Sequence, residues 1–255
     1  MHLRGPIITA LLICGVALSA AGSALAQETV TIKQASFSPN RLGSATDVFG
    51  SATIASTTGP VPSPITHIDV FGPAGVTLDL RGSATCDKES LERVGASACP
   101  ANSKAGIGGG EGIYQLGSEI VKEHYTVEFF LTDNRPGHTR MVIYLKGSTP
   151  VQIELYFDAT IIKGPKPYGL GFSLDVPLIK VLPEASDASA TSAFLRLGAH
   201  NRPYYKKVHG KRKLFHIRGI VLPNHCPHGG WPVASRFDFQ DGSTVMAKRT
   251  IDCPR

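Results

Sequence analysis

Long apolar runs are scarce in this chain. Beyond a run from residue 7 to about residue 20, no stretch approaches the roughly 20 consecutive apolar residues that a membrane-spanning helix needs. The first run is itself too short to span a bilayer. We therefore expect a soluble product with no transmembrane helix.

Recognisable catalytic motifs are also missing. The chain has no Gly-x-Ser-x-Gly, no His-Glu-x-x-His, and no Ser-x-x-Lys followed by Lys-Thr-Gly. Its glycine-rich run, 105–112, lacks the Gly-Lys-Ser/Thr with which a phosphate loop enters a helix, so we interpret this run as a flexible crossover or bulge. The sequence therefore assigns no catalytic residue and no cofactor.

Acidic residues are absent from a long segment near the C-terminus. Residues 188–237 contain no Asp or Glu but carry nine positive charges: Arg196, Arg202, Lys206, Lys207, Lys211, Arg212, Lys213, Arg218 and Arg236. Such charge asymmetry points to an anionic partner for this face. The alternative is a solvated surface that happens to be basic.

The first 26 residues have the three parts of a secretion signal in the correct order. A short basic start with His2 and Arg4 precedes the apolar run, and Ala24-Leu25-Ala26 stands just before Gln27. The sequence predicts export, with cleavage near Ala26. The mature protein would be secreted, extracellular or attached to the cell envelope.

Two alternatives to a cleaved signal depend on the same segment. Cys14 could carry a lipid, but Ile13 occupies the position where lipidation needs a small residue, and polar sequence has not yet begun there. An uncleaved N-terminal anchor is the second alternative. We favour cleavage over both.

Short strands dominate the expected secondary structure. Apolar residues alternate, and the segments end in Gly, Pro, Asn or Asp. The strands are expected at 29–37, 47–55, 65–71, 76–80, 119–132, 138–146, 151–162, 168–176, 190–199, 204–208, 211–222, 234–240 and 244–251. One short helical turn is expected at Lys88–Val94, because Asp87 can cap its start and Gly95 can end it.

These elements predict an all-β fold, an antiparallel β-sandwich or a barrel-like sheet with one short helical turn. We expect residues 27–255 to form a single domain. A split into two sandwiches near 163–168, with Gly164-Pro165-Lys166-Pro167 as the joint, is the alternative.

Four cysteines remain after cleavage, an even number that suits disulfide bonding in an oxidising compartment. They allow three pairings. We favour Cys86–Cys99, which would bracket the helical turn, and Cys226–Cys253, which would tie a loop to the last strand.

Metal binding is a competing use of the C-terminal loop. His225, Cys226 and His228 place two imidazoles and one sulfur within four residues, and His216 is near in sequence. Zinc sites, however, use a second nearby cysteine, which Cys226 lacks. His225 and His228 thus remain weak metal-ligand candidates, and we expect no bound metal.

Hydrolysis by paired carboxylates is a second alternative. Four aspartates lie within predicted strands and could act as acid and base in glycoside hydrolysis: Asp69, Asp79, Asp175 and Asp238. Aspartates at such spacing usually face solvent. We favour a protein that is not an enzyme.

The most distinctive local pattern is a predicted hairpin with His209-Gly210 as its two-residue loop. In this register Lys207 faces Arg212 and Lys206 faces Lys213, although like charges directly opposite each other destabilise a sheet. Nearer the base, Tyr205 would face Leu214 and Tyr204 would face Phe215.

A basic tip with an aromatic base suits an anionic partner. The residues we expect to bind are Lys206, Lys207, His209, Lys211, Arg212 and Lys213. An anionic cell-wall polymer, an acidic glycan or the headgroups of a membrane surface would each fit, whereas export argues against nucleic acid, which has the same electrostatics. Alternatively, the lysines only prevent an exposed strand edge from pairing with other chains.

Four segments resemble a group of uncharacterised secreted actinobacterial proteins: 38–43, 99–106, 165–172 and 204–213. The resemblance would span most of the mature chain and implies export and a shared fold. It brings no activity, cofactor or catalytic residue. The sequence therefore predicts an exported, disulfide-bonded, all-β protein that acts by binding or as part of the envelope.

Overall fold

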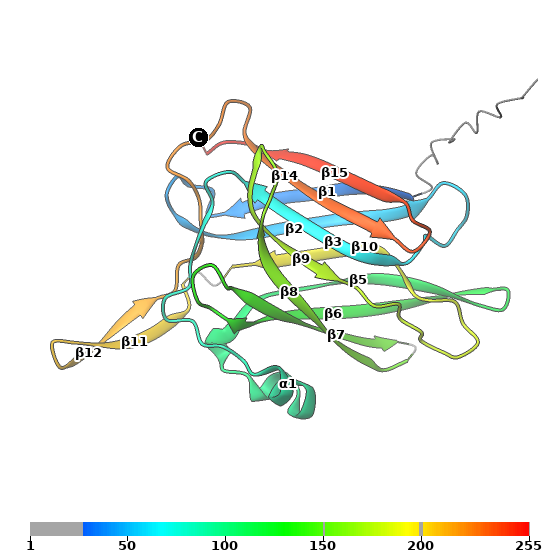
Figure 1. The fold of residues 1–255 in the computed structure, drawn as a ribbon, viewed down its shortest axis with the longest axis horizontal. Helices are drawn as coiled ribbons and strands as arrows, with labels where there is room; N and C mark the ends of the chain where they lie inside the picture. Colours follow the sequence, from blue (N-terminus) through cyan, green and yellow to red (C-terminus); the bar gives the residue numbers. More distant parts are fainter. Residues whose placement is uncertain (1–27, 150, 199–200, 255) are drawn as a thin grey trace, which may run out of the picture.

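The computed structural model describes residues 28–149, 151–198 and 201–254 (Figure 1). The predicted signal, 1–26, lies outside these residues. In chain order, the strands of the described part are β1 (Glu28–Ser38), β2 (Ala45–Ser56), β3 (Ile65–Pro73), β4 (Thr77–Asp79), β5 (Lys104–Leu116), β6 (Glu119–Asp133), β7 (Arg140–Thr149), β8 (Ile153–Lys163), β9 (Tyr168–Asp175), β10 (Ser189–Leu197), β11 (Pro203–Val208), β12 (Lys211–His216), β13 (Gly219–Val221), β14 (Trp231–Phe239) and β15 (Thr244–Ile251). The α-helix of this part is α1 (Lys88–Val94), followed by 3-10 turns at Ala96–Ala98 and Ala101–Ser103. The predicted all-β fold with one short helix is confirmed.

One antiparallel sheet takes up nearly all of these strands. Its order is β15-β14-β3-β9-β8-β7-β6-β5-β10-β2-β13-β4. Strand β1 pairs with residues 47–56 of β2. The sheet curls until β1 and β15 lie side by side, so that β1, β2, β14 and β15 face β5 to β8 across an interior (Figure 1). The result is barrel-like. Strands β11 and β12 form a separate hairpin that projects from this body.

Strands β6 and β7 have consecutive apolar residues because both of their faces are covered. Phe129 and Leu131 pack in the interior with Met141, whereas Phe130 and Val142 pack on the outer face beneath α1. Two-sided burial removes the simple alternation of polar and apolar residues that a half-exposed strand shows.

Helix α1 is held at both ends, as the sequence predicts. The Asp87 carboxylate accepts a hydrogen bond from the Ser90 backbone N–H at 2.9 Å, and Gly95, with φ of 85°, ends the helix. Leu91 is fully buried against the sheet. The helix therefore closes the outer face of β6 and β7.

Both predicted disulfides are present, Cys86–Cys99 and Cys226–Cys253. The first encloses α1 and its following 3-10 turn. The second joins the segment before β14 to the chain just beyond β15. The favoured pairing is confirmed.

The glycine-rich run, interpreted above as a flexible crossover or bulge, is a strand, with a shift in its register against β6 between Lys104 and Gly106. Its residues form most of β5, which pairs along its length with β6 and β10. A Cβ on Gly110 would lie 2.0 Å from the Ser192 carbonyl oxygen, and one on Gly108 would lie 2.6 Å from that of Phe194. Glycine thus allows a close approach of β10 to β5.

The predicted strand 211–222 is two strands. Strand β12 ends at His216, and Gly219, with φ of 65°, begins β13 where the chain returns from the hairpin to the main sheet. There β13 pairs with β2 and β4.

The proposed joint at 163–168 is the turn between β8 and β9. The Gly164 N–H donates to the Gly169 carbonyl at 2.7 Å, and the two strands pair from Ala159↔Leu174 to Lys163↔Leu170. Both strands belong to the large sheet.

Candidate functional site

The hairpin β11–β12 has the predicted register. Lys206 pairs with Lys213, Lys207 with Arg212, and Tyr205 with Leu214. At the tip, His209 has φ of 50° and Gly210 φ of 75°, the two positive values of a type I′ turn.

Nearly every residue of the hairpin is exposed, because the hairpin leaves the body of the protein (Figure 1). Alternation places the paired side chains Lys206 and Lys213 on one face and Lys207 and Arg212 on the other. Both faces therefore present positive charge.

Aromatic rings stabilise the base of the hairpin. The rings of Tyr204 and Phe215 stack with centroids 5.7 Å apart, and the Arg212 guanidinium lies 3.9 Å from the centroid of the Tyr205 ring. Tyr205 and Leu214 nevertheless remain 57% and 51% exposed. These contacts offset part of the repulsion between the paired cations and leave apolar surface accessible.

An open cleft of about 620 Å³ separates the base of the hairpin from the body. Tyr204, Tyr205 and Arg212 line it on the hairpin side, and Asn102 lines it on the body side. A Cβ on Gly82 would lie 2.3 Å from the Tyr204 ring, so the glycine makes room for that ring. The cleft combines aromatic faces with one guanidinium.

The remaining cations of the acid-free segment are engaged in the body. Arg196 and Arg236 form ion pairs at 3.0 Å with Asp47 and Asp238. Arg202 donates to the Ala101 carbonyl at 2.7 Å, and burial lowers the pKa of its guanidinium. Arg218 likewise donates to a backbone carbonyl, that of Gly43.

The hairpin cations differ in this respect. Among the residues that the structure describes, Lys206, Lys207, Lys211, Arg212 and Lys213 form no ion pair with a carboxylate. The unneutralised charge of the segment is therefore concentrated on the hairpin. Arg236 pairs with an aspartate two residues away on its own strand. The partners of Arg196, Arg202 and Arg218 are 101 to 175 residues away, so sequence alone could not separate these three cations from those of the hairpin.

The loop with His225 and His228 does not gather ligands in the described structure. Cys226 is bonded to Cys253, so its sulfur is not a free thiolate. Within the described ranges, no three side chains of His, Cys, Asp or Glu are grouped as a metal site would require. Both imidazoles are exposed.

Two of the four strand aspartates meet at a histidine that the sequence analysis did not single out. His67 Nδ1 lies 2.6 Å from Asp175 Oδ1, and His67 Nε2 lies 3.1 Å from Asp69 Oδ1 and 3.2 Å from Ser173 Oγ. All four side chains lie on the outer face of β3 and β9. The spacing His-x-Asp on β3 and Ser-x-Asp on β9 places each pair on one face, but only the register joins them.

This cluster resembles a Ser-His-Asp arrangement but has a second carboxylate on the histidine. Burial alone lowers the pKa of His67, yet hydrogen bonds from its ring to the carboxylates of Asp175 and Asp69, together with their charges, raise the pKa above 6.5 overall. A carboxylate faces each ring nitrogen, which favours the imidazolium. The nitrogen that faces Ser173 is thus also paired with Asp69, which a Ser-His-Asp arrangement does not have.

The other two aspartates are separate from this cluster. The Asp79 carboxylate accepts hydrogen bonds from Nε and Nη2 of Arg81. These hydrogen bonds lower the pKa of the Asp79 carboxyl group. Asp238 pairs with Arg236 and accepts a hydrogen bond from Thr244 at 2.7 Å. Each carboxylate thus has a structural partner.

Comparison with protein-family models, with curated proteins and with solved structures finds no match for this chain. No helix in the described part of the chain is both long and apolar enough to cross a membrane. Two disulfides are typical of proteins that fold in an oxidising compartment.

Proposed function

We propose that this protein is exported and uses the hairpin β11–β12 to bind an anionic polymer of the cell envelope. The observation that carries the proposal is the set of five hairpin cations without carboxylate partners in the described structure. Cations that face each other across a hairpin cost stability unless an anion neutralises them. An extended polyanion would neutralise both faces.

The arrangement along the hairpin favours a polymer over a bilayer. A hairpin that inserts into a membrane would carry its large apolar side chains at the tip. Here the tip pair is Val208 with Lys211, the next pair is Lys207 with Arg212, and the larger apolar side chains Tyr205 and Leu214 lie nearer the base. A chain bound along the hairpin would contact the cations first and then reach Tyr205 and the cleft beneath it. Sugar rings stack on exposed aromatic faces of this kind.

Export belongs to the same proposal. Its support is the order of basic, apolar and small residues in 1–26, together with the two disulfides. Similarity to secreted actinobacterial proteins remains a prediction. N-terminal sequencing of protein recovered from culture medium or envelope should give Gln27 as the first residue.

Charge reversal tests the binding surface. The variant has Lys206→Glu, Lys207→Glu, Arg212→Glu and Lys213→Glu. The wild-type protein should be retained on immobilised polyphosphate or an acidic polysaccharide at about 0.05 M salt and released as salt rises, because screening shortens the reach of exposed charges. The variant should not be retained at any salt concentration.

A control variant carries the same charge change on exposed lysines elsewhere, at Lys33, Lys163, Lys166 and Lys248. It should keep most of the wild-type retention if the hairpin is the site. Equal loss in both variants would mean that net charge alone drives retention. Binding to anionic vesicles without binding to either polymer would contradict the polymer and support a lipid surface. Circular dichroism and thermal unfolding verify that both variants fold.

A further inference from the structure

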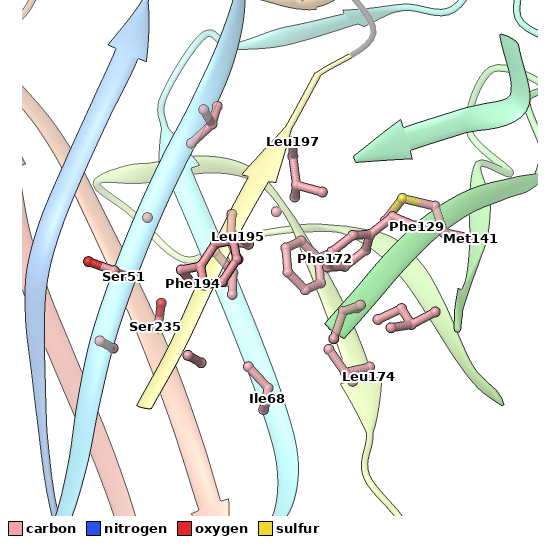
Figure 2. Close-up of a pocket in the computed structure, with 18 of the residues that line it drawn as sticks. Ser51, Ile68, Phe129, Met141, Phe172, Leu174, Phe194, Leu195, Leu197 and Ser235 are labelled. Carbon is pink, nitrogen blue, oxygen red and sulfur yellow. The ribbon is translucent and has the colours of Figure 1, made fainter. Parts of the chain in front are cut away.

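A cavity of about 380 Å³ lies inside the curled sheet. Its lining includes Phe129, Met141, Phe172, Leu174, Leu195 and Leu197, whose side chains converge from β6, β7, β9 and β10 (Figure 2). This cavity is distinct from the hairpin and its cleft. Nothing in the proposed function uses it.

The geometry of the sheet accounts for the space. An eight-stranded barrel is about wide enough to be filled by its own side chains or to hold one small ligand, and the interior widens with each added strand. The path from β15 to β2, extended by β1, encloses the cavity with more strands than that. Side chains of ordinary size therefore cannot fill the interior.

Small residues on one wall enlarge the gap. On β2 and β10, Gly50 pairs with Leu195 and Ala52 pairs with Ala193, all on the interior face. Large residues such as Phe172 stand on the opposite wall, on β9. Short side chains facing long ones leave a pocket between the two walls.

Several interior side chains are only partly buried, as expected for residues that border a cavity. Four side chains face the interior and pack against buried residues such as Phe129 and Leu131, yet remain partly accessible: Ile68, Val127, Leu145 and Leu195. Side chains in a filled core would have protein atoms on every side. Here part of their surface borders the cavity.

The side chains that line the cavity determine which kind of ligand it can bind. An apolar cavity of about 150 Å³ in another protein stays free of water and binds benzene, and this cavity is more than twice that size. The side chains that line it are almost all apolar, so a charged group of a ligand would lose its hydration there without gaining a partner. Tyr125 is engaged there, since its hydroxyl donates to the Ser192 carbonyl at 2.9 Å.

We propose that this cavity is a binding site for a neutral hydrocarbon ligand, either a single alkyl chain or a fused ring system. The protein would then combine an outer surface for an anionic polymer with an inner site for an apolar molecule. The second site does not depend on the first.

Fluorescence titration tests the site. The neutral probe N-phenyl-1-naphthylamine should bind the wild-type protein at one molecule per chain with enhanced, blue-shifted emission. Dodecanol should displace it if alkyl chains fit, and unlabelled anthracene if ring systems fit. Dodecanoate should compete at least about tenfold less well than dodecanol, because its carboxylate would be buried without a partner. No saturable probe binding, or stronger competition by dodecanoate, would overturn the proposal.

Variants locate the bound probe. Ala193→Phe should fill the cavity and abolish binding, and Ala52→Leu, a smaller addition on the paired strand, should weaken it by about tenfold. Met246→Phe adds an aromatic ring at a residue that is 40% exposed on β15 and should bind as the wild type does. Unchanged binding in a folded Ala52→Leu protein would place the probe on the surface and overturn the proposal. The hairpin charge-reversal variant should bind the probe normally.

Thermal unfolding gives a readout that needs no variant. A ligand that binds only the folded state raises the melting temperature as its concentration rises. Dodecanol should therefore raise the melting temperature of the wild-type protein, in step with probe displacement. A melting temperature that stays constant or falls across the displacement range would contradict an interior site.

Discussion

At the scale of single residues, a cation is available to bind a ligand only if no carboxylate of the protein already pairs with it. Arg196 and Arg236 belong to the same acid-free segment as Lys206 and Arg212, yet the first two are neutralised by aspartates from β2 and β14. The sequence predicts the segment's excess charge but not which cations remain available. Arg196 pairs with an aspartate 149 residues away, on another strand, whereas Arg236 pairs with Asp238 on its own strand.

His67 leads to a prediction about pH and stability. Because hydrogen bonds and charges from Asp175 and Asp69 outweigh the effect of burial, its folded-state pKa lies above the unfolded value of 6.5. The stabilisation is therefore fully present below about pH 6.5 and is lost as pH rises through the folded-state pKa. His67→Gln should lower the free energy of unfolding at about pH 5.5, by no more than roughly 1 kcal/mol for so accessible a site.

Urea unfolding at about pH 5.5 and pH 9 measures this effect. The difference between the wild-type protein and His67→Gln should shrink at the higher pH. His228→Gln, at an exposed histidine, serves as the control and should show no such dependence. A stability difference for His67→Gln that grows with pH would show that the imidazole is stabilised in its neutral form instead.

At the scale of elements, features encoded by neighbouring residues could be predicted well. The limits of α1 follow from Asp87 and Gly95, and the hairpin register follows from the turn His209-Gly210. The glycine-rich strand β5 could not be predicted in the same way. Its glycines are needed for contact with β10, about 80 residues further along the chain.

The glycines of β5 give a second prediction about stability. Gly110→Ala would place a Cβ 2.0 Å from the Ser192 carbonyl oxygen, so either β5 or β10 must move. We expect a loss of at least about 2 kcal/mol in the free energy of unfolding. Gly50→Ala is the matched control, since its Cβ would meet only the Leu195 side chain, at 3.9 Å.

The control should change stability by less than about 1 kcal/mol, and removal of backbone freedom from the unfolded chain could make it stabilising. Urea unfolding of both variants measures the difference. Equal stability for the two alanine variants would mean that β10 has room to shift away from β5.

At the scale of the whole molecule, strand composition predicts an antiparallel all-β fold but not the interior. Alternation along β10 places Ala193, Leu195 and Leu197 on one face whether the sheet is flat, stacked or curled. Only strand order and curvature place these side chains opposite Phe172 and leave a cavity between them. The cavity exists because side chains from different strands leave space between them, and no pattern within a single strand encodes that space.

Side-chain contacts rather than a strand ladder close the sheet, among them the packing of Phe37 on β1 with Ile251 on β15. In the described residues no ladder joins β1 to β15. Instead, Arg249 on β15 donates to the Ile32 carbonyl of β1 at 2.9 Å, and Asn40 donates to the Asp252 carbonyl at 2.9 Å. The disulfide Cys226–Cys253 fixes the chain just beyond β15.

The seam between β1 and β15 should therefore be the part of the sheet most sensitive to loss of the second disulfide. Cys226→Ala with Cys253→Ala should lower the free energy of unfolding by roughly 3.5 kcal/mol, for a sequence separation of 27. Amide hydrogen exchange should accelerate first in β15, because a strand held on one side opens locally before the sheet unfolds. Cys86→Ala with Cys99→Ala is the comparison: it should cost roughly 3 kcal/mol for a separation of 13 and accelerate exchange around α1. Equal acceleration across all strands in the first variant would mean that the seam opens only with global unfolding, and that closure resides in the ladders rather than in this disulfide.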